Sequence, residues 1–268
     1  MKIENKTTLK AAREETHAAV QLIAMVPRHL LPADPTDSTA SLIWDDKLNM
    51  LTTQEVDGYK VAFEFATQEI HIYKRDSREV TLATIGNTFE QVFENLIQKL
   101  ISIGLSGDFL KRDLPYELPE SVMQHGQPFK KQEAEALTIL TELYATTSKV
   151  LQEVFSSVSS ASEIRCWPHH YDLATLVTLV KHENPEEAKS IGFGFSPGDG
   201  GYDEPYFYLT PWPYPSTEKL YEIRKPAFWN TEGWTGGVLK ASDLNSANAE
   251  TTIFDFFENG YHKLKEIL

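Results

Sequence analysis

The sequence has a single cysteine, no long apolar run and a shortage of positive charge. Cys166 has no second cysteine with which to form a disulfide, which suits a reducing compartment, and its place beside Trp167 in a predicted strand indicates a buried thiol. No apolar run approaches the roughly 20 residues that a membrane-spanning helix needs. The N-terminal sequence MKIENKTTLK also lacks the apolar core of a signal peptide. These absences predict a cytoplasmic protein.

The charge balance is acidic. Lys and Arg number 25 against 39 Asp and Glu, which gives a formal net charge of −14. Such a field repels nucleic-acid phosphates and anionic lipid headgroups, so we expect neither nucleic acid nor a membrane surface as a partner. A composition of 41% hydrophobic and 24% charged residues is that of a globular chain and excludes a disordered or collagen-like one.

The first half of the chain reads as a helix, a meander of strands and a second helix. Apolar residues at helical spacing predict a helix over 7–26, ended by Pro27. Asp57-Gly58 separates two alternating runs and predicts a hairpin. A further helix begins after Asn87 and Thr88, which precede Glu90 and Gln91 at the spacing of a capping box.

The second half repeats this order after a connecting segment over 105–128. It has a predicted helix over 130–158, a strand ending in Trp167, further strands and a last helix over 249–267. The distance from helix start to tryptophan is 37 residues in both halves (44 − 7 and 167 − 130). We therefore predict an α+β fold of two fused helix–antiparallel sheet–helix repeats that share one core. The repeats cover 1–128 and 129–268, the second with a long loop insertion, and coincidence is the alternative.

The densest polar cluster is Trp167-Pro168-His169-His170-Tyr171-Asp172. If it is a strand, alternation places His170 and Asp172 on one face and His169 on the other. An imidazole and a carboxylate so placed can share a divalent metal or act as a general-base pair. The candidate catalytic residues are therefore His170, Asp172 and His169. The candidate metal ligands are His170 and Asp172. The alternative is a structural His–Asp hydrogen bond. Further candidate ligands are Asp199, Asp203, Glu204 and His17.

A glycine-rich loop over 192–201 fits the G-x-S-x-G pattern at Ser196. The residue after that serine is Pro197, which has no N–H to donate to an oxyanion, so a hydrolase nucleophile elbow is excluded. The glycine spacing also differs from the dinucleotide-binding pattern. The loop therefore indicates close backbone approach, either to a ligand or to the protein's own strands.

The third signal is a concentration of aromatic and proline residues over 202–234. Aromatic side chains with polar tips line ligand pockets, and they also hold long loops in place. In the predicted strand from Tyr206, alternation puts Tyr206 and Tyr208 on one face. The candidate ligand-binding residues are Asp199, Asp203, Tyr206, Tyr208 and Trp212.

Three of these segments carry a family resemblance. Trp167 followed by Tyr171-Asp172-Leu173-Ala174 resembles the Phe-Trp-Gly-Ser-Phe-Asp-Leu-Ala signature of an uncharacterised bacterial family, a domain of unknown function. Gly194–Gly200 is similar to that family's Gly-Phe-Trp-Pro-Gly-Asp, and the aromatic strand over 206–208 also fits. His169-His170 stand where the family has Gly-Ser, so the resemblance implies an architecture and a loop cluster but no histidine metal site and no activity.

Two functional hypotheses follow. The first is a small-molecule enzyme that uses the His170–Asp172 pair or a bound divalent metal. The second is a non-catalytic binding module that uses the aromatic, proline-rich loop 202–234. The sequence indicates neither the ligand nor the oligomeric state.

Overall fold

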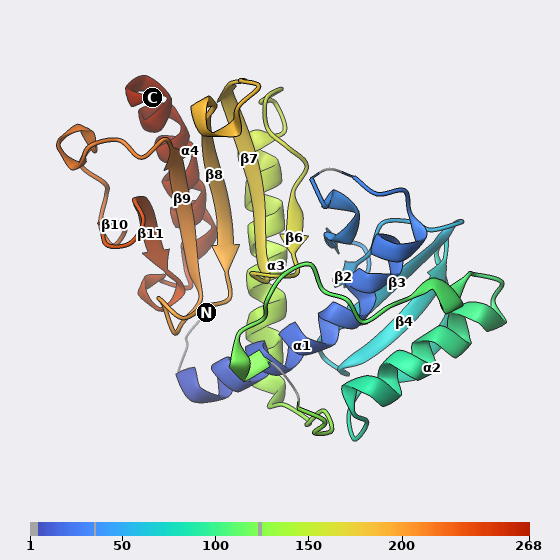
Figure 1. Cartoon of the computed structure of the whole chain (residues 1–268). Coiled ribbons are helices and arrows are strands. Elements are labelled where there is room, and N and C mark those ends of the chain that lie inside the picture. The colour runs from blue at the N-terminus through green and yellow to red at the C-terminus, as the bar shows by residue number, and fades with distance from the viewer. Residues whose placement is uncertain (1–4, 35, 123–124) are drawn as a thin grey trace. The chain divides into compact units, whose positions relative to one another are not determined.

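A computed structural model describes residues 5–34, 36–122 and 125–268 (Figure 1). These residues form two compact units, which are described separately below. The N-terminal unit consists of Thr7–Glu142 and Cys166–Tyr171. The C-terminal unit consists of Leu143–Arg165, Asp172–Leu268 and the described N-terminal residues up to Lys6. The repeat boundary between 128 and 129 stays a prediction, because compactness and repetition are different criteria.

The N-terminal unit contains an antiparallel sheet of five strands in chain order and two helices. The helices are α1 (Lys6–Leu30) and α2 (Phe89–Ser102). The strands are β1 (Ile43–Asp45), β2 (Met50–Thr52), β3 (Tyr59–Glu64), β4 (Glu69–Lys74) and β5 (Ser77–Ala83). The predicted meander is confirmed.

Two local predictions in this unit are confirmed and one is wrong. Asp57 and Gly58 have φ of 50° and 80°, as a tight hairpin turn requires. Thr88 caps α2 and forms a capping box with Gln91. Pro27, however, does not end α1, which continues to Leu30. Pro27 has no N–H to donate to the carbonyl of Ile23, but its own carbonyl accepts the N–H of Leu31 at 2.9 Å, so the helix continues past it.

The larger part of the sheet's apolar core in the N-terminal unit lies on one face. Alternate residues of β3 and β4 are fully buried there, and the apolar face of α2 supplies further buried residues. These side chains are Val61, Phe63, Ile70 and Ile72 from the sheet and Val92, Phe93, Leu96 and Leu100 from α2. The opposite face also buries side chains, namely a smaller apolar cluster of Met50, Ala62 and Tyr73 and the side chain of His71.

The C-terminal unit is built on a six-stranded antiparallel sheet with the order β10-β11-β9-β8-β7-β6. The strands are β6 (Arg165–Trp167), of which only Arg165 is counted in this unit, β7 (Asp172–Val180), β8 (Lys189–Ser196), β9 (Tyr206–Trp212), β10 (Phe228–Asn230) and β11 (Gly236–Lys240). The helices are α3 (Ala134–Phe155), which belongs to this unit from Leu143 onward, and α4 (Ala249–Ile267). Aromatic rings join them to the sheet: Phe155 lies 4.6 Å and Phe257 6.1 Å from Phe193, centroid to centroid.

Four α-helices and two antiparallel sheets among the described residues confirm the α+β class. Each half has the element order helix–sheet–helix, and the first strand of each sheet carries a tryptophan, Trp44 or Trp167. Each of these strands is followed by a four-residue turn that ends in a residue with positive φ, Asn49 at 57° and Tyr171 at 60°. The equivalence of the halves as repeats stays a prediction. Within the described residues, no helix combines the length and apolarity that crossing a membrane requires.

Candidate functional site

The predicted polar cluster lies on a turn and not on a continuous strand. Residues 168–171 form the turn between β6 and β7, and β7 begins at Asp172. Pro168 has no N–H for a strand ladder, and Tyr171 has φ of 60°, so the chain reverses here. The expectation that strand alternation sets the facing of His169 and His170 is therefore wrong.

Three polar side chains of the N-terminal unit hold this turn. The carbonyl of Pro168 accepts hydrogen bonds from His17 Nε2 at 2.7 Å and Gln21 Nε2 at 2.8 Å. Tyr116 donates its hydroxyl to Gln21 Oε1 at 2.7 Å. The His17 ring also stacks on Tyr171, with centroids 4.8 Å apart and planes 7° apart. Burial lowers the pKa of His17 to about 4, so at neutral pH this imidazole is uncharged and donates its Nε2–H to the turn.

The two histidines of the turn lie against each other. The rings of His169 and His170 are 4.2 Å apart, and the ring of His169 also lies 5.5 Å from that of Tyr116. Burial, followed by the neighbouring His170, lowers the pKa of His169 to about 4. His169 is therefore a neutral imidazole at pH 7, a form that can accept a proton or bind a metal.

In the C-terminal unit, Asp172 is paired with a tyrosine. Its Oδ2 accepts the hydroxyl of Tyr208 at 2.5 Å. Gly194 of β8 lies between them and pairs in register with Tyr208 and with Ala174. A Cβ at Gly194 would lie only 2.7 Å from the Tyr208 hydroxyl oxygen, so the glycine lets this side chain cross the strand. The expectation of a loop over 192–201 is wrong in its first part, because β8 extends to Ser196. The predicted close approach at a glycine is to the protein's own strands, since the same Cβ would lie 2.8 Å from the Leu173 carbonyl oxygen.

A second tyrosine–aspartate pair lies beside the first. Asp199 Oδ2 accepts the Tyr206 hydroxyl at 2.6 Å, and its Oδ1 accepts the N–H groups of Gly201 and Tyr202. Burial and then Asp199 raise the pKa of Tyr206, which keeps the phenol protonated. The rings of Tyr206 and Tyr208 are 6.2 Å apart.

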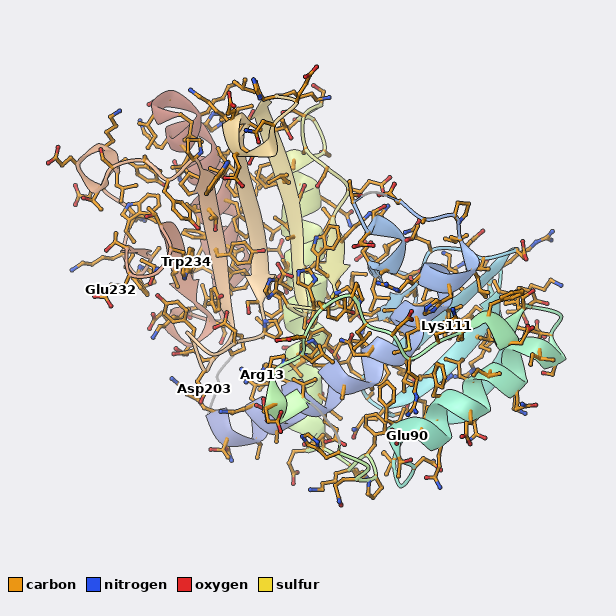
Figure 2. All side chains as sticks on the ribbon, in the orientation of Figure 1. Arg13, Glu90, Lys111, Asp203, Glu232 and Trp234 are labelled. Carbon is orange, nitrogen blue, oxygen red and sulfur yellow. The ribbon has the colours of Figure 1, made fainter. Side chains whose placement is uncertain are left out.

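The remaining predicted ligand-binding residues take different places. The strand period puts Trp212 on the same face of β9 as the two tyrosines, where its ring meets Tyr214 at 5.5 Å. Asp203 is exposed before β9, as labelled in Figure 2. The buried carboxylate of Glu204 pairs with Lys6 at 3.0 Å and Lys240 at 3.3 Å.

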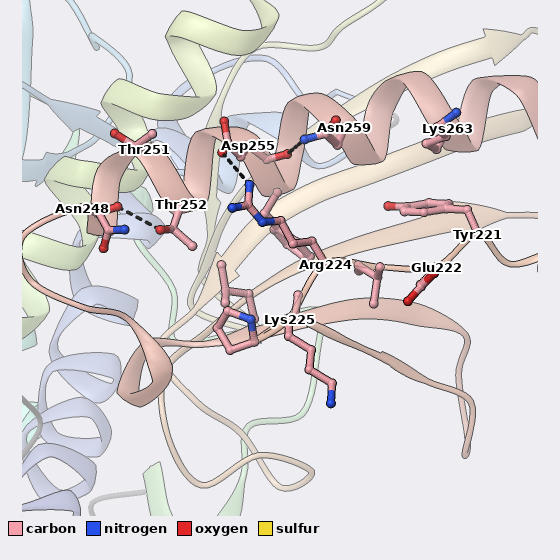
Figure 3. A pocket seen from close by; sticks show the side chains of 15 residues that line it. Tyr221, Glu222, Arg224, Lys225, Asn248, Thr251, Thr252, Asp255, Asn259 and Lys263 are labelled. Atoms are coloured by element: carbon pink, nitrogen blue, oxygen red, sulfur yellow. Dashed lines mark hydrogen bonds and ion pairs between the residues drawn. The ribbon is translucent and has the colours of Figure 1, made fainter.

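A cavity of about 610 Å³ opens in the C-terminal unit between the segment 221–227 and α4 (Figure 3). Its walls combine apolar side chains with a few polar ones. The apolar part comes from Ile223, Ala227, Leu239 and Phe256, and the polar part includes Arg224, Thr252, Asn259 and Lys263.

The polar groups of this cavity converge from the loop and from the helix. Arg224 extends toward α4, where Nη1 lies 3.6 Å from Asp255 Oδ2, whereas Lys225 points away from the helix (Figure 3). Tyr221 is fixed because its carbonyl accepts Trp229 Nε1–H at 2.8 Å. Burial raises the pKa of Tyr221 to about 12, so it stays a neutral phenol.

The sequence prediction reached only half of this cavity. Residues 221–227 lie in the aromatic, proline-rich loop, but the contribution of α4 was missed. The sequence contained a signal for the helix side of the cavity. Polar residues recur at helical spacing from Asn248, which caps α4, to Thr252, Asp255 and Asn259 within the helix.

Metal-binding side chains gather at a different place from the one expected. Of the residues that the structure describes, Glu64, Glu69 and His71 form the one group of three whose ligand atoms lie close enough to share an ion. His170 and Asp172 are not members of this group, and the hypothesis of a metal at that pair stays a prediction.

The comparisons with known proteins support the predicted resemblance. A family model described as "Family of unknown function (DUF5996)" matches residues 7–267. Neither the comparison with curated proteins nor that with solved structures found a match. The residues matched by this family model extend over both units, which confirms the expected relation to a domain of unknown function. The chain therefore belongs to DUF5996, a family of unknown function.

Proposed function

We propose that this protein is a binding module for a small molecule, and that the ligand occupies the cavity between residues 221–227 and α4. The observation that carries the proposal is the cavity itself. Its volume of about 610 Å³ is within the range of small-molecule sites, roughly 300–1,000 Å³. An apolar wall with a few converging polar groups is also the usual composition of such a site.

The polar groups favour a ligand with an acidic group on an apolar body. The ion pair of Arg224 with Asp255 is 3.6 Å long, and the two side chains are 88% and 41% exposed. So exposed a pair contributes little to stability, which leaves the guanidinium available for another partner. A carboxylate or phosphate would accept two parallel N–H bonds from it. The body of the ligand would then pack on Ile223 and Phe256.

The charge of the chain supports a small molecule over a large polyanion, and an acidic ligand then depends on the cations of the cavity itself. A net charge of −14 disfavours nucleic acid and anionic membranes, so a small molecule is the partner we propose and the cytoplasm is the place. The cavity lining has the three cations Arg224, Lys225 and Lys263 against the two carboxylates Glu222 and Asp255, a net charge of 3 − 2 = +1 within this acidic chain.

The alternative function is an enzyme that uses the turn of His169 and His170 with Asp172. The observation behind it is the pair of adjacent imidazoles, whose rings are 4.2 Å apart, although a pKa of about 4 makes His169 a weak general base at neutral pH. The Tyr208–Asp172 hydrogen bond supports a structural use of that carboxylate instead. The experiment below separates the two functions.

The test is a binding screen with three aromatic ligands of one size, which carry a carboxylate, a phosphate or an uncharged amide. Binding is measured by thermal shift and mapped by amide chemical shifts in ¹H–¹⁵N spectra. We expect the acidic ligands to raise the melting temperature and to shift the amides of 221–227 and of α4. Asn259→Trp should abolish this binding by filling the cavity, since Asn259 lines it and is exposed.

The matched control is His262→Trp, an exposed position on the same helix that does not line the cavity. It should bind like the unchanged protein. The proposal is wrong if no ligand binds at millimolar concentration, or if Asn259→Trp leaves binding unchanged. Shifts centred on His169, His170 and Asp172 would favour the enzyme.

A further inference from the structure

We propose that Glu64, Glu69 and His71 form a site for a divalent transition-metal ion on the face of the N-terminal sheet opposite Phe63 and Ile70. This site is separate from the cavity of the proposed function and does not depend on it. It rests on the register of β3, β4 and β5 and on the positions of three ligand atoms.

The strand register places the three side chains on one face. Glu64 of β3 pairs directly with Glu69 of β4, and Ala62 pairs with His71. Because side chains alternate along each strand, Glu64, Glu69 and His71 all face away from the core residues Phe63 and Ile70. Two glutamates are thus directly opposite each other, an arrangement that destabilises a hairpin unless a positive charge lies between them.

The distances suit a shared ion. His71 Nε2 lies 3.0 Å from Glu64 Oε2 and 3.9 Å from Glu69 Oε2. One ligand atom from each of the three residues lies within 4.8 Å of the others. Ligand atoms bonded at about 2.0–2.2 Å to one ion are about 3 Å apart, so small side-chain movements would complete the arrangement.

The surroundings hold the ligands as a metal site requires. The His71 side chain is fully buried, and its Nδ1 lies 3.0 Å from Thr81 Oγ1. A hydroxyl both donates and accepts, so Thr81 can accept the Nδ1–H while Nε2 presents its lone pair to the ion. Thr67 orients the Glu64 carboxylate by donating its hydroxyl to Glu64 Oε2 at 2.8 Å.

The chemistry of the donors indicates the kind of ion. Glu64 and Glu69 are 28% and 31% exposed, which lets an ion enter and water fill the remaining positions. Across the described residues, their ion-pair contacts are with His71 alone, and neither pairs with a lysine or arginine. Two carboxylates neutralise a divalent ion, and one imidazole with carboxylates favours Mn²⁺, Fe²⁺ or Zn²⁺ over Mg²⁺ or Ca²⁺.

The test uses Mn²⁺ and the whole chain after treatment with a chelator. Mn²⁺ broadens nearby amide signals, so ¹H–¹⁵N spectra locate the ion, and titration calorimetry gives the affinity. We expect one ion per chain, with broadening centred on residues 62–64, 69–71 and 81. Glu69→Gln should weaken binding at least tenfold, and Thr81→Val should weaken it about tenfold by releasing the His71 ring.

The matched control is Glu187→Gln at the exposed pair of His182 and Glu187, whose Nε2 and Oε2 atoms are 3.4 Å apart. It should bind Mn²⁺ like the unchanged protein.

The melting temperature gives a second test of the metal site. In chelator, Glu69→Gln should melt at or above the unchanged protein, because it removes the repulsion with Glu64. With saturating Mn²⁺, the unchanged protein should gain stability and Glu69→Gln should not.

Three results would overturn this proposal. They are no binding at millimolar Mn²⁺, broadening centred on another part of the chain, or the same affinity in Glu69→Gln as in Glu187→Gln. Glu69→Gln keeps the shape of the side chain at a partly exposed position, and circular dichroism checks that the variant is folded.

Discussion

Gly194→Ala tests how Tyr208 of β9 and Asp172 of β7 pack across Gly194 of β8. A Cβ at this position would lie 2.7 Å from the Tyr208 hydroxyl oxygen and 2.8 Å from the carbonyl oxygen of Leu173. The second contact is to the backbone of the neighbouring strand, which cannot move without disturbing the β7–β8 ladder. Tyr208 must then swing away, and Asp172 loses its hydroxyl donor.

The expected cost adds two contributions. Overpacking in a well-packed region costs about 1–3 kcal/mol. Loss of a hydrogen bond to a charged acceptor costs about 1.5–3 kcal/mol. We therefore expect Gly194→Ala to lower the free energy of unfolding by about 2.5–6 kcal/mol. In a Tyr208→Ala background the cost should shrink, because only the Leu173 contact remains.

The same strand offers a matched control. The nearest atom to a Cβ at Gly192 is the Thr210 carbonyl oxygen at 3.9 Å, an ordinary contact. Gly192→Ala should therefore be neutral or stabilising by up to about 1 kcal/mol, because alanine restricts the unfolded chain. Urea unfolding monitored by circular dichroism measures the free energy of unfolding of both Gly194→Ala and Gly192→Ala. A difference between the two variants below about 0.5 kcal/mol would refute this account of the pair.

Two further predictions concern buried side chains of the N-terminal unit. The pKa of His17 is about 4 against 6.5 in an unfolded chain, so between these values the unfolded state binds the extra proton and stability falls as the pH falls. This residue accounts for about 3 kcal/mol of that loss. His17→Gln keeps a donor for Pro168 without titrating, so urea unfolding from pH 7 to pH 4 should show a shallower decline, and equal slopes would contradict the assignment. Cys166 is fully buried, and its backbone N–H and carbonyl both bond to Leu42. Its thiol should therefore react with a thiol reagent only after unfolding, and rapid labelling of native protein would show otherwise.

The sequence predicted the fold where local signals decide it. Thr88 with Gln91 and the pair Asp57-Gly58 fix a helix start and a hairpin through contacts of near neighbours. The prediction that Pro27 ends the helix is wrong because proline removes one hydrogen bond from a helix without necessarily ending it, and α1 continues to Leu30. The alternating polar residues over 168–171 predict a strand, and that prediction is wrong. Pro168 and the positive φ of Tyr171 make this segment a turn.

The candidate site was harder to predict because its partners are distant in sequence. Tyr208 and Asp172 are 36 residues apart, and only the register of β7, β8 and β9 brings them together. His17 and Pro168 are 151 residues apart. Glu64 and Glu69 are near in sequence, yet they face each other only because the turn between β3 and β4 sets that register. Spacing alone does not encode these pairings.

A crystal structure of the protein with the aromatic carboxylate of the binding screen tests the central claim most directly. The account predicts the ligand between residues 221–227 and α4, with its carboxylate on the Arg224 guanidinium in place of Asp255 and its ring against Ile223 and Phe256. A ligand bound at the His169–His170 turn, or a cavity closed by the protein's own side chains, would contradict it.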